Sequence, residues 1–363
     1  MNTTKRIMSF GLSPIAAALA GLLVATSAPA QADDAGKKPV IASLVQPMDN
    51  PWVVNNVNFQ KAVASALGID LFVTTDKGTE DSNIAAMQGL IARRPDGILF
   101  DPITQAAGRE DAKMLEEAGI RGVTEDRLVV PNIDSYQGKQ LIAEVTQSNE
   151  QWGYDMMMSL IDQGSKKIVA ILDPHGVTTV EEAWKGALRA VADHPGVTVL
   201  QDTWQPKSRE NAIATMEGYL ARYRPGEMDG CWCIGSTVGL GALQAIKQAG
   251  RAAEVKVSTA DDDDSVIKAI QDGSLTSTLG GHWMNGGFGL IVLYDALKGH
   301  QPVSRQPHFN LITIDKTNAE AYAARFLHGA PFSADQIRQM SLAYNPNANL
   351  PEVMANLRST WSK

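Results

Sequence analysis

Short apolar runs alternate with longer amphipathic stretches in the first half of the chain. In the stretches between the runs, apolar residues recur at steps of three and four, which is typical of helices. Continuous apolar strands between such helices are typical of a parallel sheet covered on both faces. The pattern predicts strands over residues 40–45, 70–74, 97–100 and 119–123, and helices over residues 54–67, 81–92 and 108–118.

A second series of the same kind follows a polar stretch over residues 126–147. The pattern there predicts strands over 167–172, 197–203, 230–234, 255–259 and 275–279, and helices over 152–162, 180–192, 211–222, 238–249 and 263–271. A helix over 284–297 and a looser C-terminal segment with a last strand over 311–314 follow. Two series of similar size predict an α/β fold with two Rossmann-like lobes, each containing a parallel sheet.

The N-terminus has the order of a secretory signal peptide. Lys5 and Arg6 precede an apolar stretch over 15–26, and Ala30-Gln31-Ala32 offers a small-x-small cleavage site. The apolar stretch is too short to favour a membrane span, although an N-terminal anchor helix is the alternative. We therefore predict a signal peptide over residues 1–32, cleaved near Ala32, and a periplasmic location.

Composition narrows the classes of partner. The roughly 330 residues that follow the leader suffice for two domains, each with its own core. The formal net charge of −8 argues against nucleic acid, which favours a basic surface. The two cysteines, Cys231 and Cys233, lie two apart in a predicted strand, where an unstrained disulfide is disfavoured. Buried free thiols and a strained redox pair are both compatible with that spacing.

Ligands of open parallel sheets bind beyond the carboxyl ends of the strands, so the residues there are the candidates. The loop after the first strand contains Asn50, Pro51 and Trp52 but no glycine, which argues against a dinucleotide site. An indole and an amide suit a sugar ring and its hydroxyls. Alternatively, Asn50 caps a helix that begins at Pro51, and Trp52 packs in the core.

Three further strand ends carry polar or aromatic groups. Asp126 and Arg127 follow the fourth strand, either as ligand contacts or as a surface ion pair. Four aspartates occupy 261–264 without the pattern of a calcium loop, and we expect Asp261 to face the cleft while the others cap a helix or meet solvent. Trp283 follows two glycines and is predicted to form a second aromatic wall.

Catalytic patterns are not found in the sequence. The histidines lack the spacing of a zinc-binding helix, and neither a nucleophile elbow nor a phosphate-binding loop is present. We therefore predict that the protein is not an enzyme and uses no cofactor and no metal.

Over nearly the whole mature chain, the sequence resembles the type I periplasmic binding proteins that serve ribose-type sugar ABC transporters. The resemblance is carried by Asn50-Pro51-Trp52, by residues 96–104 and 123–127, and by the Asp261 strand end. It implies that Asn50, Trp52, Asp126, Arg127 and Asp261 bind sugar. It also implies three crossovers, near Gln147, Gly280 and His308, that form a hinge between the lobes.

The resemblance further implies the boundaries of the lobes. Residues 33–147 and about 281–309 would form the first lobe, and residues 148–280 and about 310–363 the second lobe and tail. Ribose itself is disfavoured, because an arginine that relatives place in the second lobe falls near Glu181. A Glu181 carboxylate in the cleft would suit an amine-bearing ligand as well as a polyol.

The resulting hypothesis is a monomeric periplasmic protein that captures a sugar, polyol or sugar derivative and delivers it to the membrane permease of an ABC importer. The alternative is a periplasmic sensor that signals to a membrane histidine kinase, similar to the receptors for trimethylamine oxide and autoinducer-2. In that case Trp52 and Trp283 could hold a quaternary or N-oxide group through cation–π contact.

Overall fold

The computed structural model describes residues 37–130, 132–205 and 208–361, and the proposed signal peptide lies outside them. Two six-stranded sheets organise residues 38–363, with strand orders β11-β5-β4-β3-β1-β2 and β12-β10-β9-β8-β6-β7. Every pairing in the first sheet is parallel, and in the second sheet only the β10–β12 pairing is antiparallel. The predicted fold class, two α/β lobes with parallel sheets, is confirmed.

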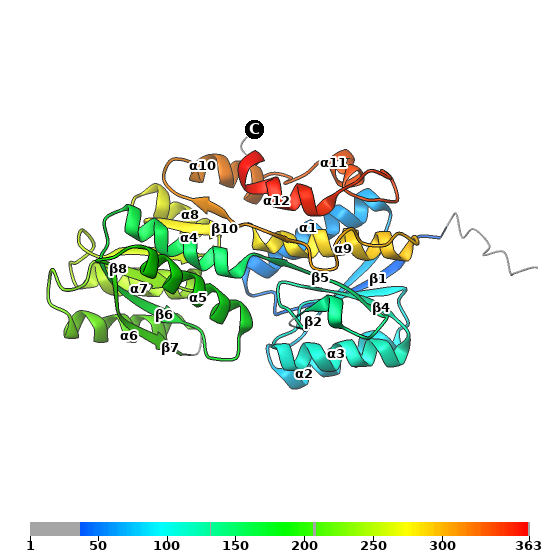
Figure 1. The fold of residues 1–363 in the computed structure, drawn as a ribbon, viewed down its shortest axis with the longest axis horizontal. Helices are drawn as coiled ribbons and strands as arrows, with labels where there is room; N and C mark the ends of the chain where they lie inside the picture. Colours follow the sequence, from blue (N-terminus) through cyan, green and yellow to red (C-terminus); the bar gives the residue numbers. More distant parts are fainter. Residues whose placement is uncertain (1–36, 131, 206–207, 362–363) are drawn as a thin grey trace, which may run out of the picture. The chain divides into compact units, whose positions relative to one another are not determined.

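The first lobe contains the first sheet, with helices on both of its faces (Figure 1). Its strands are β1 (Val40–Val45), β2 (Asp70–Thr75), β3 (Gly97–Phe100), β4 (Arg121–Glu125), β5 (Leu141–Gln147) and β11 (His308–Phe309). Its helices are α1 (Pro51–Leu67), α2 (Glu80–Ala92), α3 (Gln105–Ala118), the short η1 (Ile133–Ser135) and α9 (Asn285–Leu297).

The second lobe repeats this arrangement around the second sheet. Its strands are β6 (Lys167–Leu172), β7 (Thr198–Trp204), β8 (Gly230–Cys233), β9 (Lys256–Ala260), β10 (Ser277–Gly280) and β12 (Ile312–Ile314). Its helices are α4 (Asn149–Asp162), α5 (Thr178–Asp193), α6 (Arg209–Arg222), α7 (Ser236–Gln248) and α8 (Asp264–Gln271).

Alternation along the strands explains why helices cover both faces of the first sheet. Successive strand residues point to opposite faces. In β1, Ile41 and Val45 join the core beneath α1 and α9, whereas Ala42 and Leu44 join the core beneath α2 and α3. Both faces of the strand are apolar, so neither can face water without losing hydrophobic stabilisation of about 25 cal/mol per Å².

The described chain crosses between the lobes three times. The first crossing runs from β5 into α4, and the second runs from β10 through the short η2 (His282–Met284) into α9. The third runs from β11 to β12. Gly281, with φ of 99°, lies in the second crossing, where a side chain would also collide with the Met284 methyl group. These crossings match the three expected from the sequence.

The C-terminal segment is more ordered than the sequence indicated, and it contacts both lobes. It contains α10 (Ala319–Tyr322), a π-helical turn η3 (Ala323–Leu327), α11 (Ala334–Gln339) and α12 (Leu350–Thr360). The Asp295 carboxylate of α9 accepts hydrogen bonds from the Leu342 amide at 2.8 Å and the Ala343 amide at 3.1 Å. Arg358 of α12 pairs with Asp155 of α4. The segment, which the resemblance assigned to the second lobe and tail, therefore contacts elements of both lobes.

Cys231 and Cys233 are buried in β8 as free thiols, with 3.3 Å between their sulfur atoms. Burial raises the pKa of the Cys233 thiol well above its ordinary value. This arrangement agrees with the interpretation of two buried core thiols.

Within the described ranges, no helix combines the length and the apolar character needed to span a bilayer.

Candidate functional site

A cavity of about 80 Å³ lies where strand ends of both lobes meet, and its size limits a guest to one small molecule. Each lining residue follows or ends a strand or begins the next helix, as expected for a parallel α/β sheet. The lining residues are Gln46, Asn50, Trp52, Asp126, Arg127, Gln147, Trp152, Asp173, Val177, Thr179, Val180, Ile234, Asp261 and His282.

The start of α1 supplies an amide and an indole. The Asn50 side chain accepts a hydrogen bond from the Trp52 amide at 3.1 Å, and Pro51 occupies the first helical turn. The helix-cap interpretation is therefore correct, yet both Asn50 and Trp52 also line the cavity. Capping fixes the direction of α1, and that direction places the Trp52 indole against the cavity.

Asp126 and Asp261 occupy corresponding turns in the two lobes. Asp126 follows β4 with φ of 63°, and Asp261 follows β9 with φ of 71°. A residue other than glycine held in the left-handed region costs about 1–3 kcal/mol, and such strain is concentrated at binding and active sites. Surrounding contacts hold both turns, since the Asp126 amide donates to the Val145 carbonyl at 3.0 Å and the Thr278 hydroxyl donates to the Asp261 carbonyl.

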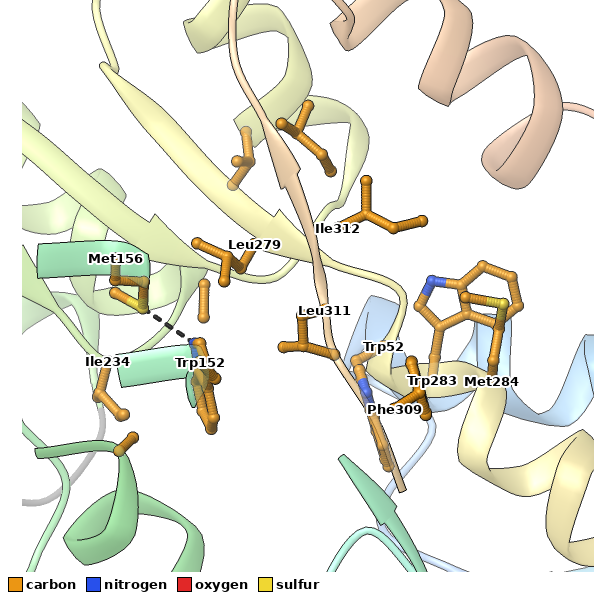
Figure 2. Close-up of a cluster of buried hydrophobic side chains, with 14 of the residues drawn as sticks. Trp52, Trp152, Met156, Ile234, Leu279, Trp283, Met284, Phe309, Leu311 and Ile312 are labelled. Atoms are coloured by element: carbon orange, nitrogen blue, oxygen red, sulfur yellow. Dashed lines mark hydrogen bonds between the residues drawn. The ribbon is translucent and has the colours of Figure 1, made fainter. Parts of the chain in front are cut away.

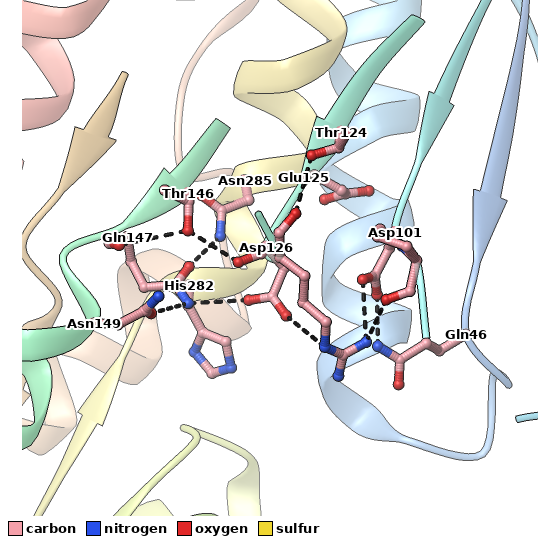
Figure 3. Close-up of polar contacts among 12 residues, drawn as sticks. Gln46, Asp101, Thr124, Glu125, Asp126, Thr146, Gln147, Asn149, His282 and Asn285 are labelled. Atoms are coloured by element: carbon pink, nitrogen blue, oxygen red, sulfur yellow. Dashed lines mark hydrogen bonds and ion pairs between the residues drawn. The ribbon is translucent and has the colours of Figure 1, made fainter. Parts of the chain in front are cut away.

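A polar network connects the first lobe to the crossings (Figure 3). Gln147, the last residue of β5, donates to Asp126 at 3.1 Å and to Asn149 at 2.7 Å. The Asn285 amide, at the start of α9, donates to the Gln147 side-chain carbonyl at 2.5 Å. One glutamine therefore links a cavity carboxylate to residues of the first and second crossings.

Arg127 is held among carboxylates. Its guanidinium donates to the Asp101 carboxylate at 3.3 Å and to the Pro102 carbonyl at 2.9 Å. Burial disfavours the charged guanidinium, but the neighbouring carboxylates outweigh burial and raise the pKa of Arg127. Burial also raises the pKa of Asp101, against the opposing effect of Arg127. Arg127 therefore stays charged and oriented at the cavity.

Asp261 accepts hydrogen bonds at the opposite side of the cavity. Its carboxylate accepts from the Ser236 amide at the start of α7 at 2.8 Å and lies 3.3 Å from His282 Nε2. Asp263 caps α8, accepting from the Ser265 amide at 3.0 Å, as expected. Asp262 differs from the expectation: it is buried and accepts from the Gly281 amide and the Trp283 indole.

Two predicted residues do not reach the cavity. Glu181 is exposed on α5 and accepts from the Gly176 amide at 3.0 Å, because the preceding Thr179 and Val180 take the positions that face the cavity. Trp283 is only 2 % exposed and packs against Phe59 and Phe326. Figure 2 shows its indole beside Met284. Because Glu181 lies outside the cavity, its carboxylate does not add the negative charge that the sequence suggested there.

Trp152 and His282 provide the aromatic surface that the sequence assigned to Trp283. The His282 ring stacks on Trp52, with ring centroids 5.4 Å apart, and on Trp152, with centroids 6.2 Å apart. The Trp152 indole nitrogen points toward the Met156 sulfur (Figure 2). The sequence did carry a positional signal for Gln147, which ends β5, and for Trp152, which lies in the first turn of α4 after that strand, but the polar residues of β5 concealed the strand.

The residues at the cavity suit a small polyhydroxylated ring. Carboxylates accept hydrogen bonds from hydroxyl groups, while the Arg127 guanidinium can donate to ring and hydroxyl oxygens. The indoles offer flat apolar faces.

Among the described residues, no group of three or more histidine, cysteine, aspartate or glutamate side chains could hold a metal ion.

Comparison with known proteins agrees with this geometry. The family model described as "Periplasmic binding protein domain" matches residues 41–301. The fructose import binding protein FruE of Bifidobacterium longum is 27% identical over 248 residues, which cover 67% of this chain and 74% of that protein. The D-allose-binding periplasmic protein of Escherichia coli is 24% identical over 302 residues, covering 81% and 94%.

Solved structures share the fold. The periplasmic binding protein component of the arabinose ABC transporter from Shewanella sp. ANA-3, bound to L-arabinofuranose, superimposes with a TM-score of 0.71 at 22% identity, covering 80% of this chain and 99% of that chain. A solute binding protein from Actinobacillus succinogenes with bound D-allose gives a TM-score of 0.72 at 21% identity, covering 78% and 100%.

Proposed function

This chain belongs to the periplasmic binding protein family, and from that premise we propose that it captures a sugar or polyol in the periplasm and delivers it to the permease of an ABC importer. One observation carries the proposal: a single cavity is lined by residues of both lobes. The first lobe contributes Trp52, Asp126 and Arg127, and the second lobe contributes Trp152 and Asp261. A guest that contacts residues of both lobes holds the lobes together around it, and a permease can then recognise that closed form of the protein.

The relatives favour a sugar and favour import over sensing. The two related proteins described above are named for fructose import and D-allose binding, and the two solved structures are components of ABC transporters with bound sugars. Sugars of this kind present several hydroxyl groups around one small ring. The carboxylates and indoles at the cavity are suited to those groups.

Binding without catalysis fits the residues at the cavity. The cavity carboxylates, amides and indoles that the proposal uses all act by binding a polar guest. A protein that only captures and releases its guest needs neither cofactor nor metal. The proposal includes a monomer in the periplasm, reached through cleavage of the leader near Ala32.

A thermal-melt screen tests the proposal. We expect one or more of D-ribose, D-allose, D-fructose, L-arabinose and myo-inositol to raise the melting temperature, with an effect that grows with ligand concentration. A ligand at one hundred times its Kd should stabilise the fold by about 2.7 kcal/mol. If no sugar or polyol has any effect at millimolar concentration, the proposed function is wrong.

Two aspartates of one run provide the control for that screen. Asp261→Ala removes a cavity carboxylate and should weaken binding by about 2–5 kcal/mol. Asp264→Ala removes a side chain that is 78% exposed and lies outside the cavity, and should leave the Kd unchanged. Asp261→Asn, which tolerates the left-handed backbone, separates loss of charge from backbone strain. Equal Kd values for both alanine variants would exclude Asp261 from the binding site.

A further inference from the structure

His282 lies within a buried column of three aromatic rings. It is 8% exposed, and its ring stacks on Trp52 of α1 at 5.4 Å and on Trp152 of α4 at 6.2 Å. The angles between the ring planes are 26° and 17°, so each indole presents a face to the imidazole. The three rings come from the first lobe, the second crossing and the second lobe. The imidazole therefore lies where the two lobes join, at the wall of the cavity.

The two ring nitrogens of His282 have different surroundings. Nε2 lies 3.3 Å from the Asp261 carboxylate. Nδ1 is buried and has no hydrogen-bond partner among the described residues. A buried polar atom without a partner is costly, and a bound molecule can satisfy it. Because His282 lines the cavity, Nδ1 is a candidate contact for a ligand oxygen.

The charges at the cavity are unbalanced without His282. Asp126, Asp173 and Asp261 contribute negative charge, and Arg127 is the cationic side chain among the lining residues besides the histidine. Indole faces next to carboxylates are the usual components of a site for an ammonium group. The imidazole already occupies that position, between the two indoles and against Asp261.

The groups around His282 favour its protonated form. Burial lowers the pKa of His282, but Asp261, Asp126 and Asp262 outweigh burial and raise it above the ordinary value. Asp261 and Asp262 follow β9, and Asp126 follows β4. From α1 and α4, the side chains stacked on the imidazole are indoles, which do not titrate.

We propose that His282 is a tethered cation that sets the charge class of the ligand, so that the site accepts neutral sugars and disfavours amine-bearing ones. The imidazolium compensates the carboxylates and donates its Nδ1 proton to a sugar oxygen. An ammonium group on the ligand would have to share the same carboxylates and indole faces with a cation that is already present. The inference rests on the proposed function and specifies the substrate class of that site.

The test compares wild type with His282→Gln, which keeps hydrogen-bonding groups but carries no charge. Calorimetry at pH 6 measures the Kd of D-allose and of D-allosamine, its 2-amino counterpart, and of whichever other neutral sugar gives the strongest melting response. Wild type should bind the neutral sugar at least tenfold more tightly than the amino sugar, and His282→Gln should shift that ratio at least tenfold toward the amine. His328→Gln is the matched control, because His328 also lies 2.9 Å from an aspartate but is 61% exposed and outside the cavity.

The pH dependence of sugar affinity gives a second test of the same proposal. The protonated fraction of His282 falls as pH rises through its raised pKa, so wild-type affinity for a neutral sugar should fall as the pH is raised from 6 through that pKa. The affinity of His282→Gln should depend less on pH than that of wild type, and the dependence that remains is expected from Asp101, which pairs with Arg127 and has its pKa raised by burial to about 7. NMR titration of the His282 ring proton, assigned by its loss in His282→Gln, should give a midpoint above the ordinary histidine pKa of 6.5 with no ligand present.

The outcomes separate the two proposals. Sugar binding with an unchanged selectivity ratio in His282→Gln, or with the same pH dependence, overturns the role of His282 and leaves the proposed function intact. A wild-type preference for the amino sugar does the same. Failure of every neutral and amino sugar to bind wild type overturns the proposed function. A His282 midpoint below the ordinary histidine pKa of 6.5 overturns the tethered cation independently of any ligand.

Discussion

His282 and Trp283 are neighbours in the chain, yet their side chains serve opposite sides of the second crossing. The indole nitrogen of Trp283 donates to the Asp262 carboxylate at 2.8 Å, and the same carboxylate accepts from the Tyr322 hydroxyl. Burial raises the pKa of Asp262, so these donors offset part of the cost of burying its charge. Anchoring Trp283 on this side leaves His282 facing the cavity.

We therefore expect Trp283→Phe to change stability and Trp52→Phe to change binding. Trp283→Phe removes a donor to buried Asp262 and should lower the free energy of unfolding by about 1–3 kcal/mol without changing the ligand Kd. The Trp52 indole nitrogen has no hydrogen-bond partner among the described residues, so Trp52→Phe should affect stability less and weaken binding more. Denaturant unfolding and calorimetry measure the two effects. A tenfold weaker Kd for Trp283→Phe at unchanged stability would contradict this assignment.

Where the strand was recognised, sequence reasoning selected residues that lie at the cavity, and their role in binding stays a prediction. Asn50, Trp52, Asp126, Arg127 and Asp261 follow apolar strands, and all line the cavity. It could not decide between adjacent side chains of a crossing, because the direction of Trp283 depends on Asp262 and Tyr322, which are distant in sequence.

At the scale of elements, the close approach of α4 and α5 positions the part of the cavity formed by Trp152, Thr179 and Val180. A Cβ atom on Gly153 would lie 1.6 Å from the Ala183 carbonyl oxygen, and one on Gly186 would lie 1.8 Å from the Glu150 carbonyl oxygen. Each helix thus uses a glycine to let the other backbone approach. Trp152 precedes Gly153, so the helix spacing also sets the position of its indole.

Gly153→Ala should force α4 and α5 apart. We expect a loss of about 1–3 kcal/mol in the free energy of unfolding, together with weaker ligand binding because Trp152 moves. Gly218→Ala is the matched control: it lies in α6 with open space around it, and should raise stability by about 0.5–1 kcal/mol. Urea unfolding of both variants measures the difference. Equal stability changes would show that helix spacing does not depend on Gly153.

The sequence predicted the central strands well, and it missed β5 for a physical reason. The bounds of β1, β3 and β6 agree with the apolar runs, because those strands are covered on both faces. In β5, buried Glu144 accepts hydrogen bonds from the Val129 amide at 2.6 Å and the Val130 amide at 3.0 Å, so a charged residue interrupts the apolar pattern. Tertiary contacts that satisfy a buried polar group leave no local pattern in the sequence.

At the scale of the whole molecule, buried carboxyl groups link folding to pH. Asp111 of α3 is fully buried, and neither of its carboxylate oxygens has a hydrogen-bond partner among the described residues. Burial, with the nearby Asp76 and Glu110, raises the pKa of Asp111 to about 8. Burial likewise raises the pKa of Glu144 to about 7, against the Val129 and Val130 amides.

These shifts predict that stability falls as pH rises. A carboxyl whose folded-state pKa is raised binds more protons in the folded than in the unfolded state. Its contribution to the free energy of unfolding is therefore complete below the ordinary pKa, and it is lost as the pH rises from the ordinary pKa to the folded-state pKa. We therefore expect a lower melting temperature at pH 9 than at pH 6. Asp111→Asn removes the buried charge and should stabilise the protein at pH 9 by about 1–3 kcal/mol, with less effect at pH 6.

Asp264→Asn is the control for that measurement, because the Asp264 side chain is 78% exposed and should leave the pH profile of the melting temperature unchanged. The folded-state pKa of His282 is also raised, so its contribution is lost in the same direction, and a residual decline in Asp111→Asn is expected from His282 and Glu144. Combining His282→Gln with Asp111→Asn should flatten the profile further. A wild-type melting temperature that rises between pH 6 and pH 9 would show that these buried groups do not control the linkage.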